Sequence, residues 1–99
     1  MDESEKRRRV KEWKLARLAE ARARLPLPDA ELSALFSMLE THFVALPCDH
    51  TRRVTESWLA ARGHSTERIG LWFDETGGFC DCEVLSNSQD AWMQATGRA

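Results

Sequence analysis

Two tripeptides, Cys48-x-His50 and Cys80-x-Cys82, contain every cysteine of the chain and one of its three histidines. Thiolate sulfur and imidazole nitrogen are the ligands that zinc prefers, and structural zinc sites bind four of them tetrahedrally. The residue types therefore predict a Cys₃His zinc site formed by Cys48, His50, Cys80 and Cys82. Four protein ligands leave no open position, so we expect the zinc to be structural.

The spacing within each tripeptide permits this geometry. Two residues at positions i and i+2 of an extended chain have Cα atoms about 6.6 Å apart and point to one face. The sulfurs of a tetrahedral zinc site lie within roughly 3.8 Å of each other, a gap that leaning side chains can close. A helix predicted to start after His50 would also stabilise the anionic cluster with its positive N-terminal end.

Other uses of the same residues remain open. The three cysteines can be buried, reduced thiols without a metal, or Cys48 and Cys80 can pair as a disulfide. An enzyme would use an open zinc site, or Cys80 or Cys82 as a nucleophile with His50 as its base. Such a base could be oriented by one of three acidic residues: Asp49, Asp81 or Glu83.

The elements that must position these ligands are predicted to be mainly helical. Helical periodicity, caps and breakers favour helices over residues 4–24, 29–46, about 51–62 and about 65–76, and a helical turn near Trp92. Residues 79–85 alternate weakly and are rich in apolar residues, which favours a short strand or hairpin. We therefore expect an α+β fold with three or four helices, forming a single small domain with a metal clip.

Charge divides the chain into two parts. Residues 1–24 carry nine Lys/Arg and five Asp/Glu, whereas residues 25–99 carry five Lys/Arg and eleven Asp/Glu. This asymmetry predicts a basic N-terminal helix or arm over residues 1–25 and a small globular zinc-binding domain over residues 26–99. The arm either contacts nucleic acid or an acidic partner, or it packs as a solvated helix on its own acidic body. Its densest basic run is Lys6, Arg7, Arg8 and Arg9.

The composition indicates a soluble globular chain. Hydrophobic residues make up 42% and charged residues 30%, and no apolar run approaches the ~20 residues of a membrane span. An odd number of cysteines cannot form a complete disulfide framework, so we expect reduced thiols and a cytoplasmic location. The narrow apolar stripe on the N-terminal helix is compatible with a monomer or a homodimer.

Two motifs carry a resemblance to a known family. The segments Pro47-Cys48-Asp49-His50-Thr51 and Gly77-Gly78-Phe79-Cys80-Asp81-Cys82-Glu83-Val84 resemble small bacterial proteins grouped as a domain of unknown function. The resemblance covers about residues 30 to 90 and leaves the basic arm outside. It implies a bacterial cytosolic protein and does not suggest any particular activity.

Ligand chemistry and composition together favour a small cytoplasmic zinc-stabilised module that binds a protein or other macromolecular partner over an enzyme, and they leave the question of enzyme activity open. The alternatives are an enzyme with an open zinc site or a thiolate, and a nucleic-acid binder that uses the basic arm.

Overall fold

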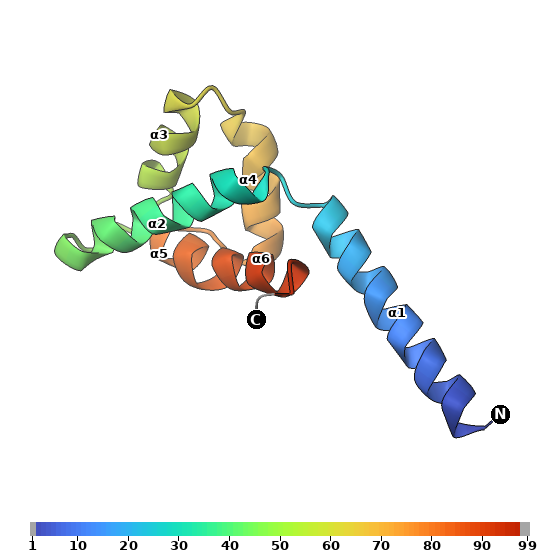
Figure 1. Cartoon of the computed structure of the whole chain (residues 1–99). Helices are drawn as coiled ribbons and strands as arrows, with labels where there is room; N and C mark the ends of the chain where they lie inside the picture. Colours follow the sequence, from blue (N-terminus) through green and yellow to red (C-terminus); the bar gives the residue numbers. More distant parts are fainter. Residues whose placement is uncertain (1, 98–99) are drawn as a thin grey trace.

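The computed structural model describes residues 2–97, and every regular element within that range is helical (Figure 1). The elements are α1 (Glu3–Ala23), α2 (Asp29–Ala45), α3 (Arg53–Ala61), α4 (Thr66–Thr76), α5 (Asp81–Glu83), the π-helix η1 (Val84–Ser88) and α6 (Gln89–Ala95). Because residues 2–97 contain no strand, the predicted α+β class is wrong. Residues 1 and 99, the outer limits of the two predicted parts, lie outside the described range.

The core forms around α2, whose apolar residues recur at helical spacing. Leu32, Leu35, Phe36 and Leu39 are almost completely buried, and together they form the inner face of this helix. The ring of Trp92 packs on Phe36 with the centroids 5.4 Å apart. Other elements contribute Leu59 from α3, Ile69, Trp72 and Phe73 from α4, and Val84 from η1.

The predicted strand over residues 79–85 is replaced by α5 and η1, which continue directly into α6. Val84, Ser88, Trp92 and Ala95 are all buried, so the inward positions recur every three or four residues, as in a helix. Ser88 interrupts the apolar pattern that would have revealed this face. Its buried hydroxyl lies 2.7 Å from the Thr76 hydroxyl, which satisfies both groups.

The turn between α4 and α5 depends on two glycines. Gly77 ends α4 in the left-handed conformation, with φ of 82°, which a glycine adopts without a steric penalty. Gly78 lies against η1, where a Cβ atom would come within 2.4 Å of Ser88 Oγ. These contacts let the chain reverse closely enough to bring residues 80–82 beside α3.

The helix α1 lies apart from this core. None of the residues Glu3–Ala23 is buried, and Figure 1 shows the helix extending away from the other elements. Its C-terminal end contacts α6, and Arg22 forms an ion pair with Asp29 at 3.1 Å. The described molecule is therefore elongated, with a largest extent of 55 Å.

None of the helices formed by residues 2–97 combines the length and apolar character that crossing a membrane requires.

Candidate metal centre

The three cysteines meet between two loops that are about thirty residues apart in the chain. One sulfur each from Cys48, Cys80 and Cys82 lies within 4.8 Å of the other two. The sulfurs of Cys80 and Cys82 are 3.3 Å apart, and all three thiols are free of disulfides. Soft sulfur ligands at these separations fit the donor set of a thiolate zinc site after small side-chain adjustments.

Cys80 and Cys82 reach the site from the beginning of a helix and not from an extended chain. Cys80 is the N-cap residue of α5 and is buried, whereas Cys82 lies in the first turn and is exposed. The backbone of Cys80 is extended at the cap position, with φ of −136° and ψ of 169°, and a side chain at this position can lean over the first turn, where Cys82 lies. The site thus has one sulfur facing the core and one facing solvent.

Cys48 is placed by the loop that connects α2 to α3. The Asp49 carboxylate accepts hydrogen bonds from the backbone N–H and the hydroxyl of Thr51, which closes a tight turn. His50 adopts φ of 68°, a left-handed conformation that is uncommon outside glycine but more frequent for histidine than for most residues. In this conformation the His50 backbone N–H donates to the Cys48 sulfur at 3.4 Å.

Asp81, the residue between Cys80 and Cys82, connects the two loops. Its carboxylate accepts from the backbone N–H groups of Val54 and Thr55 and from the Thr55 hydroxyl, at 3.1, 2.9 and 2.7 Å. It therefore caps the N-terminus of α3 from 26 or more residues away. The Asp81 backbone N–H also donates to the Thr51 carbonyl at 2.8 Å. These bonds bring the loops together without any contribution from a metal.

Arg52 connects the start of α3 to the elements on the other side of the site. Its guanidinium donates to the Gly70 carbonyl, the Gly78 carbonyl and the Asp74 carboxylate, with distances of 3.3, 3.2 and 2.7 Å. The same group lies over the Phe73 ring, 5.8 Å from its centroid. Arg52 thus ties the start of α3 to α4 and to the turn that precedes Cys80.

The surroundings of Cys48 and Cys80 shift the pKa values of the two thiols in opposite directions. The pKa of Cys48 is lowered, first because the Cys82 backbone N–H donates toward its sulfur and then because the His50 N–H does so. Burial raises the pKa of Cys80 to about 12. The polypeptide by itself therefore makes Cys48 easier to ionise than Cys80. A bound divalent cation would favour thiolates at every coordinating position.

The structure gathers three of the four predicted ligands. The imidazole of His50 is exposed, and its nitrogens are not among the atoms of the 4.8 Å cluster. The Cys₃His ligand set therefore stays a prediction. The sequence suggests for Asp81 only a role in orienting a His50 base, and it suggests no role for Arg52. Their contacts join residues far apart in the chain, and nothing in the local sequence indicates them.

The fold and the site define a class of protein: a small helical domain in which two loops bring three thiols together. A family described as "Protein of unknown function (DUF2695)" matches residues 35–87, more than half of the chain. The chain belongs to this family. The matched residues include the three cysteines and His50, and they exclude α1.

Curated relatives come from mycobacteria. "Uncharacterized protein Rv2271" of Mycobacterium tuberculosis (strain ATCC 25618 / H37Rv) and "Uncharacterized protein Mb2294" of Mycobacterium bovis are each 31% identical to the chain over 65 residues. These alignments cover 66% of the chain and 66% of each relative, just under two thirds of the relatives' own length. They confirm the resemblance to small uncharacterised bacterial proteins. No solved structure matches the chain.

Proposed function

We propose that this chain is a small zinc-binding module in which a structural zinc ion joins the α2–α3 loop to the start of α5, and that the body so stabilised binds a macromolecular partner. The observation that carries the proposal is the convergence of three cysteine sulfurs from two distant loops within 4.8 Å. Cys48, Cys80 and Cys82 supply the thiolates. A small domain gains stability from such a clip because its hydrophobic core is limited.

His50 is the proposed fourth ligand. Its backbone already contacts the Cys48 sulfur, and its exposed side chain can change rotamer without loss of packing. A neutral imidazole and three thiolates would complete a closed tetrahedral site. The reduced thiols of the proposal agree with a cytoplasmic location, where disulfides seldom persist.

Elemental analysis of the full chain, purified without a metal-affinity tag, tests the proposal. We expect about one zinc per chain, tight binding of added zinc to the stripped protein, and a higher melting temperature with zinc than without it. Cys82→Ser should remove most of the bound zinc and the metal-dependent part of the melting temperature. Metal-free protein that takes up no zinc and melts at the same temperature with or without it would overturn the proposal.

Cobalt substitution separates a closed site from an open one. The charge-transfer absorption of bound Co²⁺ grows with the number of thiolates, and its visible bands report tetrahedral geometry. His50→Ala should keep the thiolate absorption but weaken metal affinity by about 10-fold or more. Removing other groups that support a metal site lowers metal affinity by a similar factor. His42→Ala, on α2, is the matched control and should leave both unchanged. Identical affinities for the two variants would remove His50 from the site.

In the alternative in which the chain is an enzyme, one of the cysteines acts as a nucleophile. A nucleophilic thiol needs a lowered pKa and access to solvent. Cys80 is buried and its pKa is raised to about 12, which opposes a nucleophilic role for this residue. Cys82 is exposed, and a Cys82 enzyme would show alkylation by iodoacetamide that slows when His50 is replaced by alanine.

A further inference from the structure

One face of α1 combines cationic and apolar side chains in a regular pattern. Val10, Trp13, Lys14, Arg17 and Leu18 follow the i, i+3, i+4, i+7, i+8 spacing of a single helix face. Three of them are large apolar residues that remain exposed, with 50% of Val10, 60% of Trp13 and 40% of Leu18 accessible. The Arg17 guanidinium stacks over the Trp13 ring at 5.2 Å. This face thus offers apolar area bordered by positive charge.

The same face forms one wall of a groove, and α6 forms the other. The groove is shallow and open to solvent, with a volume of about 430 Å³, and Ala91, Gln94 and Ala95 line its α6 side. These side chains are uncharged and two of them are alanines, which allow close approach by another backbone. A second hollow of about 530 Å³ continues along the outer half of α1 and shares Lys14 with the first. Every residue that lines this second hollow belongs to α1, so it is an open surface of the helix that extends the groove face outward.

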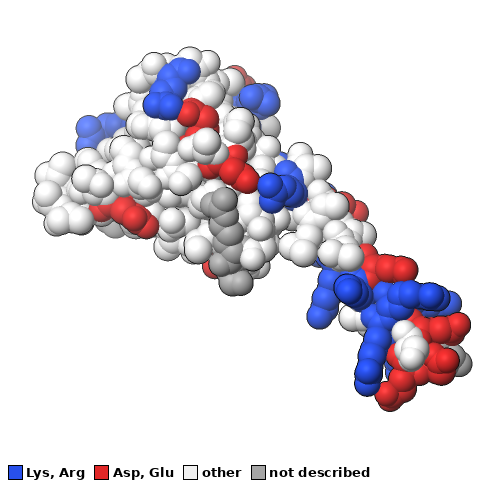
Figure 2. All heavy atoms as spheres, viewed as in Figure 1, with Lys and Arg blue, Asp and Glu red and all other residues white. Residues whose placement is uncertain are grey.

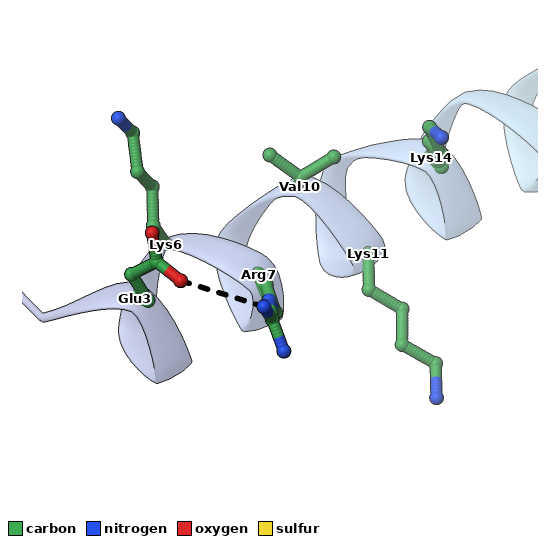
Figure 3. A pocket seen from close by; sticks show the side chains of 6 residues that line it. All are labelled: Glu3, Lys6, Arg7, Val10, Lys11 and Lys14. Atoms are coloured by element: carbon green, nitrogen blue, oxygen red, sulfur yellow. Dashed lines mark hydrogen bonds and ion pairs between the residues drawn. The ribbon is translucent and has the colours of Figure 1, made fainter.

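Basic side chains predominate along this face of α1. In the outer hollow Val10 lies between Lys6 and Lys14, and the side chains of Arg7 and Lys11 extend to one side (Figure 3). Glu3, the one acidic residue that lines either hollow, is bonded to Arg7 at 3.4 Å. Of the remaining acidic side chains of α1, Glu5 and Glu12 fall on the opposite face by helical periodicity, whereas Glu20 borders the groove beside Arg17 and Ala21. Figure 2 shows the resulting concentration of basic residues on the extended helix.

We propose that the α1–α6 groove binds an amphipathic helix of a partner protein whose polar face is acidic. Leucine-like side chains of such a helix would fill the groove over Ala91 and Ala95, and its carboxylates would meet Lys14 and Arg17. The inference deepens the proposed function, because it gives the module a docking surface and a class of partner. It requires neither the zinc ion nor the cysteine cluster.

The composition of the groove favours this occupant over three others. A nucleic acid would place phosphates against both walls, and the α6 wall carries no cation. An anionic membrane is flat, whereas the groove is concave. A second copy pairing through α1 would oppose Lys14 and Arg17 with the same cations, which is repulsive. An acidic amphipathic helix matches both the shape and the charge.

Fluorescence anisotropy with a synthetic peptide tests the proposal on the zinc-loaded full chain. The probe is a labelled helical peptide with leucine on one face and glutamate elsewhere, and we expect a Kd on the order of micromolar. Trp13→Ala should weaken binding about tenfold or more, because aromatic anchors dominate such grooves. Lys14→Glu with Arg17→Glu should weaken it at least as much, and added salt should weaken binding to the natural chain.

The charge-matched control is Arg8→Glu with Arg9→Glu, which changes the net charge equally on other faces of α1. It should leave the Kd within about twofold, since these side chains lie outside the groove. Equal loss in both double variants would show nonspecific attraction and would overturn the proposal. No peptide binding at millimolar concentration would also overturn it. So would tighter binding of duplex DNA or anionic vesicles, or self-association that Trp13→Ala abolishes.

The outcome is separable from the zinc measurement. Circular dichroism should show that Trp13→Ala keeps its helices, because the residue is exposed. Cys82→Ser, which removes the proposed zinc site, should still bind the peptide wherever the chain remains folded. If the natural chain binds zinc but not the peptide, only the groove proposal is refuted. If it binds the peptide but not zinc, only the metal-site proposal is refuted.

Discussion

The α1 arm (Glu3–Ala23) and the body (residues 26–97) are both helical, but different interactions maintain them. The arm buries none of its residues, while the α2 helix of the body buries Leu32, Leu35, Phe36 and Leu39 almost completely. Good helix formers and the Asp2 cap stabilise the arm locally. The body is stabilised by tertiary packing. Helical content alone therefore says little about which part of this molecule resists unfolding.

The two regions also use charge differently. On the arm most charged side chains are solvated and arranged by face, whereas in the body several form bonds that join separate elements. Glu31 accepts from both Arg62 and His64, and Arg52 binds Asp74 together with two carbonyl groups. Charge on the arm therefore presents a surface, and charge in the body supports the fold.

The largest expected effect comes from the core. Phe36→Ala should lower the free energy of unfolding by about 3–5 kcal/mol, because it removes a fully buried ring and leaves a cavity. Leu15→Ala on the arm should change it by less than about 0.5 kcal/mol, since Leu15 is exposed. Urea unfolding followed by circular dichroism measures both. A comparable loss for Leu15→Ala would mean that the arm contributes to the core.

An intermediate effect is expected at Asp81. Asp81→Ala should cost roughly 2–3 kcal/mol, because the N–H groups of Val54 and Thr55 and the Thr55 hydroxyl lose a buried acceptor. Asp81→Asn keeps one acceptor oxygen and should recover part of that loss. Urea unfolding of metal-stripped protein isolates this contribution from zinc. Equal stability of Asp81→Ala and the natural chain would show that the loops associate by other means.

The smallest effect is a pH dependence at Glu31. Hydrogen bonds from Arg62 and His64 lower the pKa of Glu31 from 4.5 to about 2. A lowered pKa stabilises the folded state fully above pH 4.5, and this contribution is lost as the pH falls toward 2. The stability gap between the natural chain and Glu31→Gln should therefore close over that range.

Glu3→Gln is the control on the arm, because the Glu3–Arg7 ion pair is highly exposed and contributes little. Its urea midpoint should follow the natural chain at every pH. A Glu31→Gln gap that stays constant between pH 5 and 2 would contradict the assignment of the stabilisation to the charged carboxylate.

Local sequence signals predicted most of the helices. Pro26, Pro28 and Pro47 separate the first three helices, and Ser65 and Gly77 form the caps of α4 that their residue types indicate. These features depend on a few neighbouring residues, which is why periodicity and capping rules find them. The same rules failed at residues 79–85, because the polar Ser88 interrupts the apolar pattern of the buried helix face. Ser88 can be buried there because its hydroxyl bonds to the Thr76 hydroxyl, a contact that the sequence does not indicate.

The sequence predicts that the three cysteines share a site, but it does not predict how the fold brings them together. Three cysteines in two tripeptides pointed to a shared site, and the fold brings those sulfurs together. Spacing in the sequence could not show that Cys80 caps a helix, that Asp81 caps another helix, or that the His50 ring lies outside the cluster. Each of these depends on contacts between loops that the chain forms only after it folds.

The projecting α1 arm affects how the molecule behaves in solution. A compact chain of about 100 residues has a radius of gyration near 13 Å, whereas the Cα atoms described here give 16.3 Å. Friction rises with elongation, so a monomer will elute from a sizing column ahead of a spherical protein of 11.3 kDa. Elution volume alone would therefore suggest a dimer, whereas light scattering or sedimentation equilibrium reports mass independently of shape.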